Sequence, residues 1–192
     1  SAACAGCGET PYARLLTQLL GSRVYWANAT GCSQAWGAAM PGIPYATDGR
    51  GRGPAWSNCL FENNAEFSLG MLLSVQQQRQ ALRTRVLDLH DGLPDGPAKT
   101  AARRWLDLFD VYEGSEEASD NLKEELERLP QSDAVRDILA RADHLVKPYF
   151  WMFGGDGWAY DIGYGGLDHV LASGEDINVL VVDTEVYSNT GG

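Results

Sequence analysis

The sequence predicts an α/β fold built on a mostly parallel sheet. Residues 149–153 form a continuous apolar run of the length of a buried strand, and residues 177–182 form a second one. A glycine-rich turn at 154–157 and a helical stretch over about 161–172 lie between them. Strand, turn, helix and strand in this order make a βαβ unit, whose strands run parallel and are buried on both faces.

The first helix is expected near the N-terminus, over residues 11–20. Thr10 has a side chain that can cap this helix, and Pro11 suits the first helical position. Gly21 follows the last apolar residue and is expected to close the helix.

A strand is expected next, over the short apolar run 24–27. A glycine-bearing turn with Cys32 follows it, at a strand end, where functional loops lie in open α/β sheets. Residues 40–54 have the composition of a loop, and Cys59 is expected to border the start of a helix.

The middle of the chain, residues 62–147, is predicted to be a mostly helical insertion, because its apolar residues recur at helical spacing. Breaks are expected at 91–97, 114–115 and 130. Residues 113–143 contain ten acidic and four basic side chains, a net charge of −6. We interpret this stretch as a solvated helical layer and not as a binding surface.

Composition excludes several classes of protein. The 192 residues carry 15 Lys and Arg against 26 Asp and Glu, a net charge of −11, and 44% of them are hydrophobic. The chain lacks the basic clusters that neutralise nucleic-acid phosphates and the run of about 20 apolar residues that spans a membrane. Because it begins at Ser1 and ends in small residues, we expect it to be part of a longer polypeptide.

The four cysteines are candidates for a metal or redox site. Cys4 and Cys7 have the spacing C-x-x-C, which in a reducing cytosol indicates a zinc site, an iron–sulfur cluster or a thioredoxin-type dithiol. The spacing leaves zinc and a 4Fe–4S cluster as equal alternatives. Cys32 follows a strand, whereas Cys59 is interpreted as a small buried hydrophobic residue.

A second candidate site lies where the two C-terminal strands end. The first strand leads to Gly155, Asp156 and Gly157, and the second leads to the oxygen-rich stretch 183–189. Parallel strands bind ligands at their carboxyl ends, beside the start of the following helix. A carboxylate, a hydroxyl and backbone carbonyls, completed by diphosphate oxygens and water, suit Mg²⁺.

Four longer motifs are similar to one known family. They are Cys-Ala-Gly-Cys-Gly-Glu-Thr-Pro-Tyr from residue 4, Ala-Asn-Ala-Thr-Gly-Cys-Ser-Gln-Ala-Trp-Gly from residue 27, the stretch 154–176 that begins Gly-Gly-Asp-Gly-Trp, and Asp-Thr-Glu-Val-Tyr-Ser-Asn-Thr-Gly-Gly from residue 183. Together they resemble the pyruvate:ferredoxin (flavodoxin) oxidoreductases. The resemblance is dense over residues 1–70 and 148–192 and loose between them.

The resemblance implies an incomplete thiamine diphosphate-binding domain over residues 1–192, with 62–147 as its helical insertion. It implies that three cysteines bind a 4Fe–4S cluster whose fourth ligand lies outside this chain: Cys4, Cys7 and Cys32. The implied ligands of Mg²⁺ are Asp156, Thr184 and the carbonyl of Val186. The implied contacts of the cofactor are Glu9, Cys32, Gly155, Asp156, Gly157, Trp158, Thr184, Glu185, Val186, Tyr187, Ser188 and Asn189. Asn189 is also the implied catalytic residue, placed near the aminopyrimidine and the substrate.

The activity implied is oxidative decarboxylation of pyruvate to acetyl-CoA and CO₂, with coenzyme A as co-substrate. Electrons would leave singly through the cluster to ferredoxin or flavodoxin. The family further implies a cytoplasmic homodimer and other domains of the same polypeptide, without which this chain is expected to be inactive. The alternatives are another 2-oxo acid as substrate, a small iron–sulfur carrier or scaffold with Cys59 as fourth ligand, and a zinc-stabilised interaction module.

Overall fold

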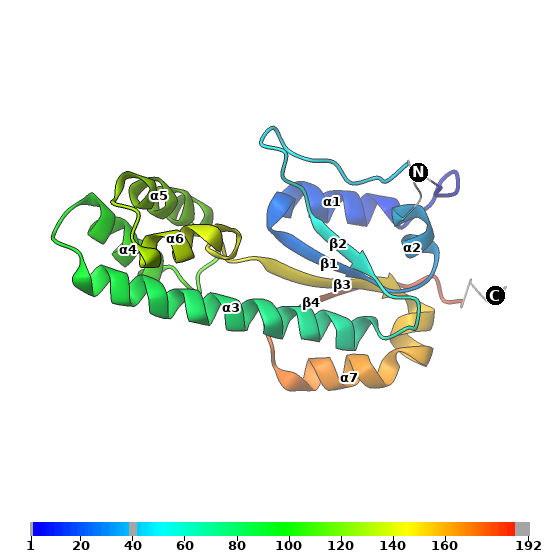
Figure 1. Cartoon of the computed structure of the whole chain (residues 1–192). Helices are drawn as coiled ribbons and strands as arrows, with labels where there is room; N and C mark the ends of the chain where they lie inside the picture. The colour runs from blue at the N-terminus through cyan, green and yellow to red at the C-terminus, as the bar shows by residue number, and fades with distance from the viewer. Residues whose placement is uncertain (1, 39–41, 187–192) are drawn as a thin grey trace. The chain divides into compact units, whose positions relative to one another are not determined.

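A computed structural model describes residues 2–38 and 42–186, and they form two compact units (Figure 1). The sheet unit comprises Ser1–Leu72 and Tyr149–Gly192, and the helical unit comprises Leu73–Pro148. The long helix α3 (Asn64–Gly92) begins in the sheet unit and its later turns belong to the helical unit.

The sheet has four parallel strands in the order β2-β1-β3-β4. The bounds of these strands are Val24–Asn28 for β1, Ala55–Asn58 for β2, Tyr149–Gly155 for β3 and Asn178–Val182 for β4. The predicted α/β class and the parallel pairing of the two C-terminal strands are therefore confirmed. Because all four strands are parallel, their carboxyl ends lie at one edge of the sheet, which we call the carboxyl edge.

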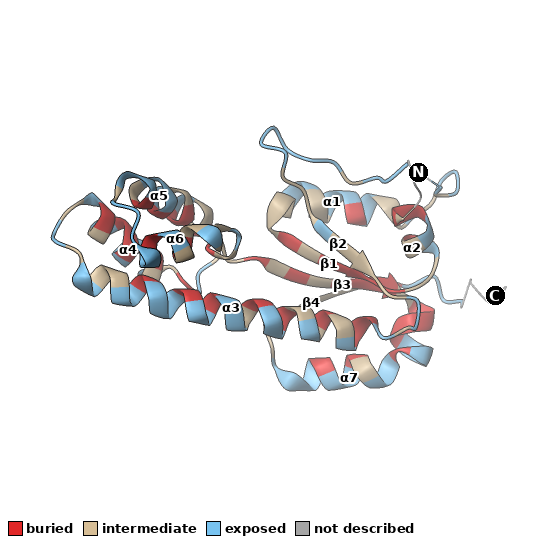
Figure 2. Ribbon diagram, in the orientation of Figure 1, coloured by how far each residue is buried: buried red, intermediate tan, exposed pale blue. Residues whose placement is uncertain are grey.

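Helices cover both faces of this sheet. Helix α1 (Thr10–Leu20) packs Ala13 against Val24 and Phe153 on one face. On the other face, Met152 packs with residues from the start of α3 and from α7 (Tyr164–Ser173). Neighbouring residues of β3 thus enter opposite cores, as expected for a strand buried on both sides. Figure 2 shows the resulting band of buried residues along the central strands.

The helical unit has a core of its own. Its helices are the later turns of α3, α4 (Pro97–Asp107), α5 (Ser115–Arg128) and α6 (Asp133–Ala140). The core is formed by the buried side chains of Leu82, Val86, Ala101, Ala102, Trp105, Phe109, Leu122, Leu126, Val135, Ile138 and Leu145. The helix breaks expected near 91–97, 114–115 and 130 coincide with the ends of these helices.

Three local predictions were wrong. Cys59 follows strand β2, which the sequence did not predict, and the next helix begins only at Asn64. Thr10 lies inside α1 and its hydroxyl donates to the carbonyl of Cys7 at 3.3 Å, so it does not cap the helix. The glycine turn expected at 154–157 is instead the end of β3 and the start of a π-helix, η3 (Gly157–Ile162), whereas the helix expected over about 161–172 is present as α7.

No helix among the described residues is both long enough and apolar enough to cross a membrane.

Candidate functional site

Asp156 links the end of β3 to the loop that follows β4. Its residue is only 9% exposed, and its Oδ1 accepts a hydrogen bond from the backbone N–H of Gly157 at 3.0 Å. Its Oδ2 accepts three more, from the N–H groups of Thr184 and Val186, both at 3.1 Å, and from the Thr184 hydroxyl at 3.2 Å. The three residues for which the resemblance implies Mg²⁺ binding are therefore in direct contact, 28 and 30 positions apart in the chain.

These contacts set the charge of the carboxylate. Burial would raise the pKa of Asp156, but the hydrogen bonds from Thr184, Gly157 and Val186 outweigh burial and lower this pKa below its ordinary value. Asp156 is therefore ionised at neutral pH, and its carboxylate is the form that binds a hard cation.

The oxygen atoms around Asp156 fit a magnesium ion. The Thr184 Oγ1 lies 3.2 Å from Asp156 Oδ2 and 3.1 Å from the carbonyl oxygen of Val186. Adjacent ligands of an octahedral Mg²⁺ with bonds of about 2.1 Å lie about 3.0 Å apart. Two of the three separations between these oxygens are therefore close to those that one ion requires.

The backbone of Glu185 shapes this loop. Glu185 is one of two residues other than glycine with a positive φ among the described residues, at 62°. Its N–H donates to Asp183 Oδ1 at 2.8 Å, which offsets part of the cost of this conformation, about 1–3 kcal/mol. Across this turn, the Thr184 hydroxyl donates a hydrogen bond to the carbonyl oxygen of Val186.

The sequence did not predict a role for Tyr160, which lies next to this loop on η3. A hydrogen bond to Asp183, together with burial and the charges of Asp183 and Asp156, raises the pKa of Tyr160. The phenol is protonated at neutral pH, as an ordinary tyrosine is, and its side chain is exposed. No spacing rule connects the two positions, because their contact depends on how the helix and the strand end meet.

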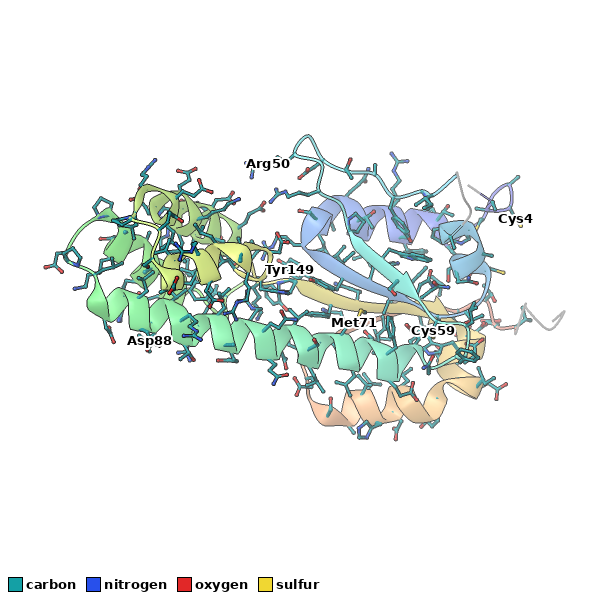
Figure 3. The ribbon with its side chains drawn as sticks, in the orientation of Figure 1. Cys4, Arg50, Cys59, Met71, Asp88 and Tyr149 are labelled. Atoms are coloured by element: carbon teal, nitrogen blue, oxygen red, sulfur yellow. The ribbon has the colours of Figure 1, made fainter. Side chains whose placement is uncertain are left out.

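The cysteines are less closely grouped. Cys4 and Cys7 share one turn, in which the Cys7 N–H donates to the Cys4 carbonyl at 3.1 Å, and Cys32 is the first residue of α2 (Cys32–Gly37) at the end of β1. Figure 3 shows Cys4 and Cys59 toward the same end of the sheet unit. Within the described ranges, no three His, Cys, Asp or Glu side chains are placed to hold one metal ion. The structure therefore does not bring the three cysteines together, and their binding of a cluster stays a prediction.

A pocket of about 660 Å³ opens beside Cys4. Its lining includes Arg14 from α1, Trp36 from α2 and Tyr45 from the loop before β2. Burial raises the pKa of Tyr45 to about 12, against the lowering effect of the Trp26 and Trp56 side chains. Of these three side chains, Trp36 and Tyr45 are neutral and Arg14 is positively charged. The pocket leaves space next to the Cys4 thiol.

Two other predicted contacts have clear structural partners. The Glu9 carboxylate accepts a hydrogen bond from the Trp36 indole N–H at 3.2 Å and so connects the start of α1 to α2. The side chain of Trp158 is buried, and a Cβ on Gly163 would lie 2.3 Å from it. Its indole belongs to the core, where the buried ring N–H has no partner among the described residues. Tyr187, Ser188 and Asn189 lie outside the described residues.

Strand β2 brings a further loop to the carboxyl edge. The Thr30 hydroxyl, after β1, donates to the carbonyl of Cys59, after β2. Leu60 and Phe61 follow, with 69% and 86% of their surface exposed. The sequence missed this apolar loop because β2 has only four residues, too few for an alternating pattern to be recognised.

Comparison with known proteins agrees with the motifs. No model of a protein family matches the chain. The chain is 56% identical over 198 residues to a pyruvate-flavodoxin oxidoreductase of Klebsiella pneumoniae and 51% identical over 198 residues to a pyruvate:ferredoxin oxidoreductase of Moorella thermoacetica. A probable pyruvate-flavodoxin oxidoreductase of Escherichia coli is 50% identical over 193 residues.

Each alignment includes 100% of this chain but only 16% or 17% of the relative. The chain thus spans about one-sixth of the length of the curated relatives it matches. The aligned region therefore extends from the first cysteine motif, through the helical unit, to the loop after β4. By sequence, the chain belongs to the family of pyruvate-flavodoxin and pyruvate:ferredoxin oxidoreductases.

Proposed function

We propose that this chain is the magnesium- and diphosphate-binding part of an enzyme that oxidatively decarboxylates pyruvate to acetyl-CoA and CO₂. The names of its relatives support pyruvate as the substrate and ferredoxin or flavodoxin as the electron acceptor. The observation that carries the proposal is the contact of Asp156 with Thr184 and Val186, in which the Thr184 hydroxyl lies 3.2 Å from the Asp156 carboxylate and 3.1 Å from the Val186 carbonyl oxygen.

The residues of the carboxyl edge would bind and orient the cofactor. Thiamine diphosphate, when bound, supplies the electron sink that decarboxylation of a 2-oxo acid needs. Asp156, Thr184 and the Val186 carbonyl would hold the ion that neutralises its diphosphate. A Cβ on Gly155 would lie no closer than 3.8 Å to any other atom, so the backbone there is accessible to a ligand. The further contacts proposed are Glu9, Cys32, Gly157, Trp158, Glu185, Tyr187, Ser188 and Asn189.

The cysteines would remove the electrons. We assign Cys4, Cys7 and Cys32 as three ligands of a 4Fe–4S cluster, with the fourth ligand outside this chain. Support comes from the position of Cys32 at the end of β1, at the same edge of the sheet as Asp156. Coenzyme A as the acetyl acceptor, a cytoplasmic location and a homodimer of the longer protein belong to the same proposal.

The experiment that tests the magnesium site compares Asp156→Asn with the wild-type chain in a thermal unfolding assay. Thiamine diphosphate with Mg²⁺ at about 100 times Kd stabilises a folded protein by about 2.7 kcal/mol, which raises Tm by several degrees. We expect this rise in the wild type and none in Asp156→Asn, because the substitution removes the anionic ligand.

Asp168→Asn is the matched control, since Asp168 is an exposed acid on α7 in the same unit. It should keep the full rise in Tm. A wild-type Tm that does not respond to the cofactor and Mg²⁺, or an equal response in Asp156→Asn, would contradict the proposal.

A further inference from the structure

Asn28 is a fully buried polar residue at the point where β1 ends. It is 0% exposed, and its carboxamide lies between two turns to which the proposed function gives different tasks. The first, the segment between β1 and α2, leads to Cys32, a proposed cluster ligand, and we call it the Cys32 turn. The second, the junction of β3 and η3, contains Asp156, a proposed Mg²⁺ ligand, and we call it the Asp156 turn. A polar side chain at such a position must be held by hydrogen bonds, because its burial is otherwise unfavourable.

The amide nitrogen of Asn28, which carries two hydrogens, has three oxygen atoms within hydrogen-bond distance, whereas the buried Oδ1 has no partner among the described residues. Nδ2 lies 3.2 Å from the carbonyl oxygen of Phe153, 2.8 Å from Ser33 Oγ and 3.1 Å from the carbonyl oxygen of Ala29. Two of these atoms are carbonyl oxygens, which can only accept, so the nitrogen and not the oxygen of the amide faces this side. The orientation of the Asn28 side chain follows from its surroundings.

The acceptors connect Asn28 to both turns. Ser33 is adjacent to Cys32, and Phe153 directly precedes the glycines that lead to Asp156. The Phe153 carbonyl also accepts the N–H of Ala29 at 2.7 Å. The junction is tightly packed, since a Cβ on Gly154 would lie 2.6 Å from the Cβ of Ala29.

We infer that Asn28 is a positioning residue that holds the Cys32 turn and the Asp156 turn in one fixed arrangement. The assignment of a task to each turn rests on the proposed function. Asn28 contacts neither proposed ligand group directly. Its amide instead fixes the carbonyl before the Asp156 turn and the hydroxyl after Cys32. Loss of its donors should therefore loosen both turns together.

Two variants and one control separate this role from general packing. Asn28→Ala removes the donors. Asn28→Asp keeps the shape of the side chain but can donate only when its buried carboxyl is protonated, that is, at low pH. The control is Asn178→Asp on β4, because the Asn178 amide likewise donates to a carbonyl of β3, that of Phe150 at 3.2 Å, but at the opposite end of the strand.

The first measurement is amide hydrogen exchange of the 192-residue chain without ligand at neutral pH. Asn28→Ala and Asn28→Asp should speed exchange in peptides that contain residues 30–35 and in those that contain 154–158, whereas Asn178→Asp should change neither. Exchange that is faster in only one turn, or equal to that of the control, would overturn the inference. This result does not depend on whether the chain binds a cofactor.

The second measurement is the affinity for thiamine diphosphate with Mg²⁺ by calorimetry from pH 5 to pH 8. The dissociation constant of each variant is divided by that of the wild type at the same pH. Loss of a hydrogen bond that orders the site should weaken binding about tenfold in Asn28→Ala at every pH. In Asn28→Asp the loss should be large at pH 8, where the buried carboxylate faces the carbonyl oxygens of Phe153 and Ala29, and should shrink toward pH 5 as the carboxyl becomes a donor.

The outcomes distinguish the two proposals. If the wild type does not bind but both turns exchange faster in the Asn28 variants, the proposed function fails and the coupling by Asn28 stands. If the wild type binds and the Asn28 variants bind as tightly as Asn178→Asp, the positioning role is overturned while the proposed function stands.

Discussion

Gly154 and Gly155 are the last two residues of β3, yet their surroundings differ. A Cβ on Gly154 would lie 2.6 Å from both the Cβ of Ala29 and the Cε3 of Trp158, two atoms of a close-packed core. The nearest atom to a Cβ on Gly155 is the carbonyl oxygen of Val182 at 3.8 Å, an ordinary contact. Gly154 is therefore required by packing. Gly155 is not, so a requirement for it would come from a ligand.

The pair Gly154→Ala and Gly155→Ala tests this difference. Gly154→Ala should lower the free energy of unfolding by about 1–3 kcal/mol, because the added methyl group overpacks the core. Gly155→Ala should leave the free energy of unfolding within about 0.5 kcal/mol of the wild type and weaken binding of thiamine diphosphate with Mg²⁺. Urea denaturation and calorimetry measure the two quantities. Equal stability of the two variants would contradict the packing described for Gly154.

Arg79 connects separate elements of the helical unit. This residue of α3 is 5% exposed, and its guanidinium donates to the carbonyls of His144 and Leu145, at 2.7 and 2.9 Å, and of Phe109 at 2.7 Å. The Phe109 carbonyl follows α4, and the other two belong to the last residue of the short helix η2 (Ala142–His144) and to the residue after it; helix ends leave such groups without partners. The guanidinium also lies 4.6 Å from the centre of the Phe109 ring.

Arg79→Ala should therefore destabilise the helical unit by about 3 kcal/mol or more, since it leaves buried carbonyls unsatisfied. Arg83→Ala is the matched control. Arg83 is exposed on the same helix, 5.5 Å from the same ring, and its loss should cost less than about 1 kcal/mol. Chemical denaturation followed by helical circular dichroism measures both. A cost for Arg79→Ala as small as that for Arg83→Ala would show that the carbonyl contacts add little.

The predictability of each element follows from its local signal. Strands β3 and β4 could be predicted because each is a continuous apolar run, and the helices of the helical unit because their apolar residues recur at helical spacing. Strand β2 could not, since four partly exposed residues carry no period. The π-helix after Asp156 could not either, because local propensities do not distinguish it from an α-helix.

The candidate site was only partly predictable. The oxygen-rich stretches after β3 and β4 indicate a shared edge, because parallel strands end together. The assignment of individual ligands came from the resemblance, and the contact of Asp156 with Thr184 and Val186 was visible only in the structure. The contacts of Asn28 and Tyr160 depend on tertiary packing and have no signature in the sequence.

Most of the negative charge and the predicted site residues lie in different units of the chain. Residues 113–143, with a net charge of −6 out of −11 for the chain, belong to the helical unit. The predicted metal and cofactor residues all belong to the sheet unit. Net charge therefore says little about the ligand of this chain, and the composition of the carboxyl edge says more.

A chain in which a flexible Gly/Ser linker of about 16 residues, with a mean span of about 20–24 Å, replaces residues 73–148 tests this separation. We expect the shortened chain to retain the rise in Tm on addition of thiamine diphosphate and Mg²⁺, because the helical unit supplies none of the proposed ligands. Asp156→Asn in the shortened chain should abolish that rise. If the shortened chain shows a cooperative unfolding transition but does not respond to the cofactor, the chemistry is not confined to the sheet unit.

Electron paramagnetic resonance with Mn²⁺ in place of Mg²⁺ tests the metal site at Asp156, since Mn²⁺ accepts the same octahedral oxygen ligands. At a fixed concentration of thiamine diphosphate, adding the wild-type chain should decrease the signal of unbound Mn²⁺ beyond the decrease caused by the cofactor alone, and adding Asp156→Asn should not. An undiminished Mn²⁺ signal with the wild type, or the same decrease with Asp156→Asn, would contradict the assignment of a metal site to Asp156, Thr184 and Val186.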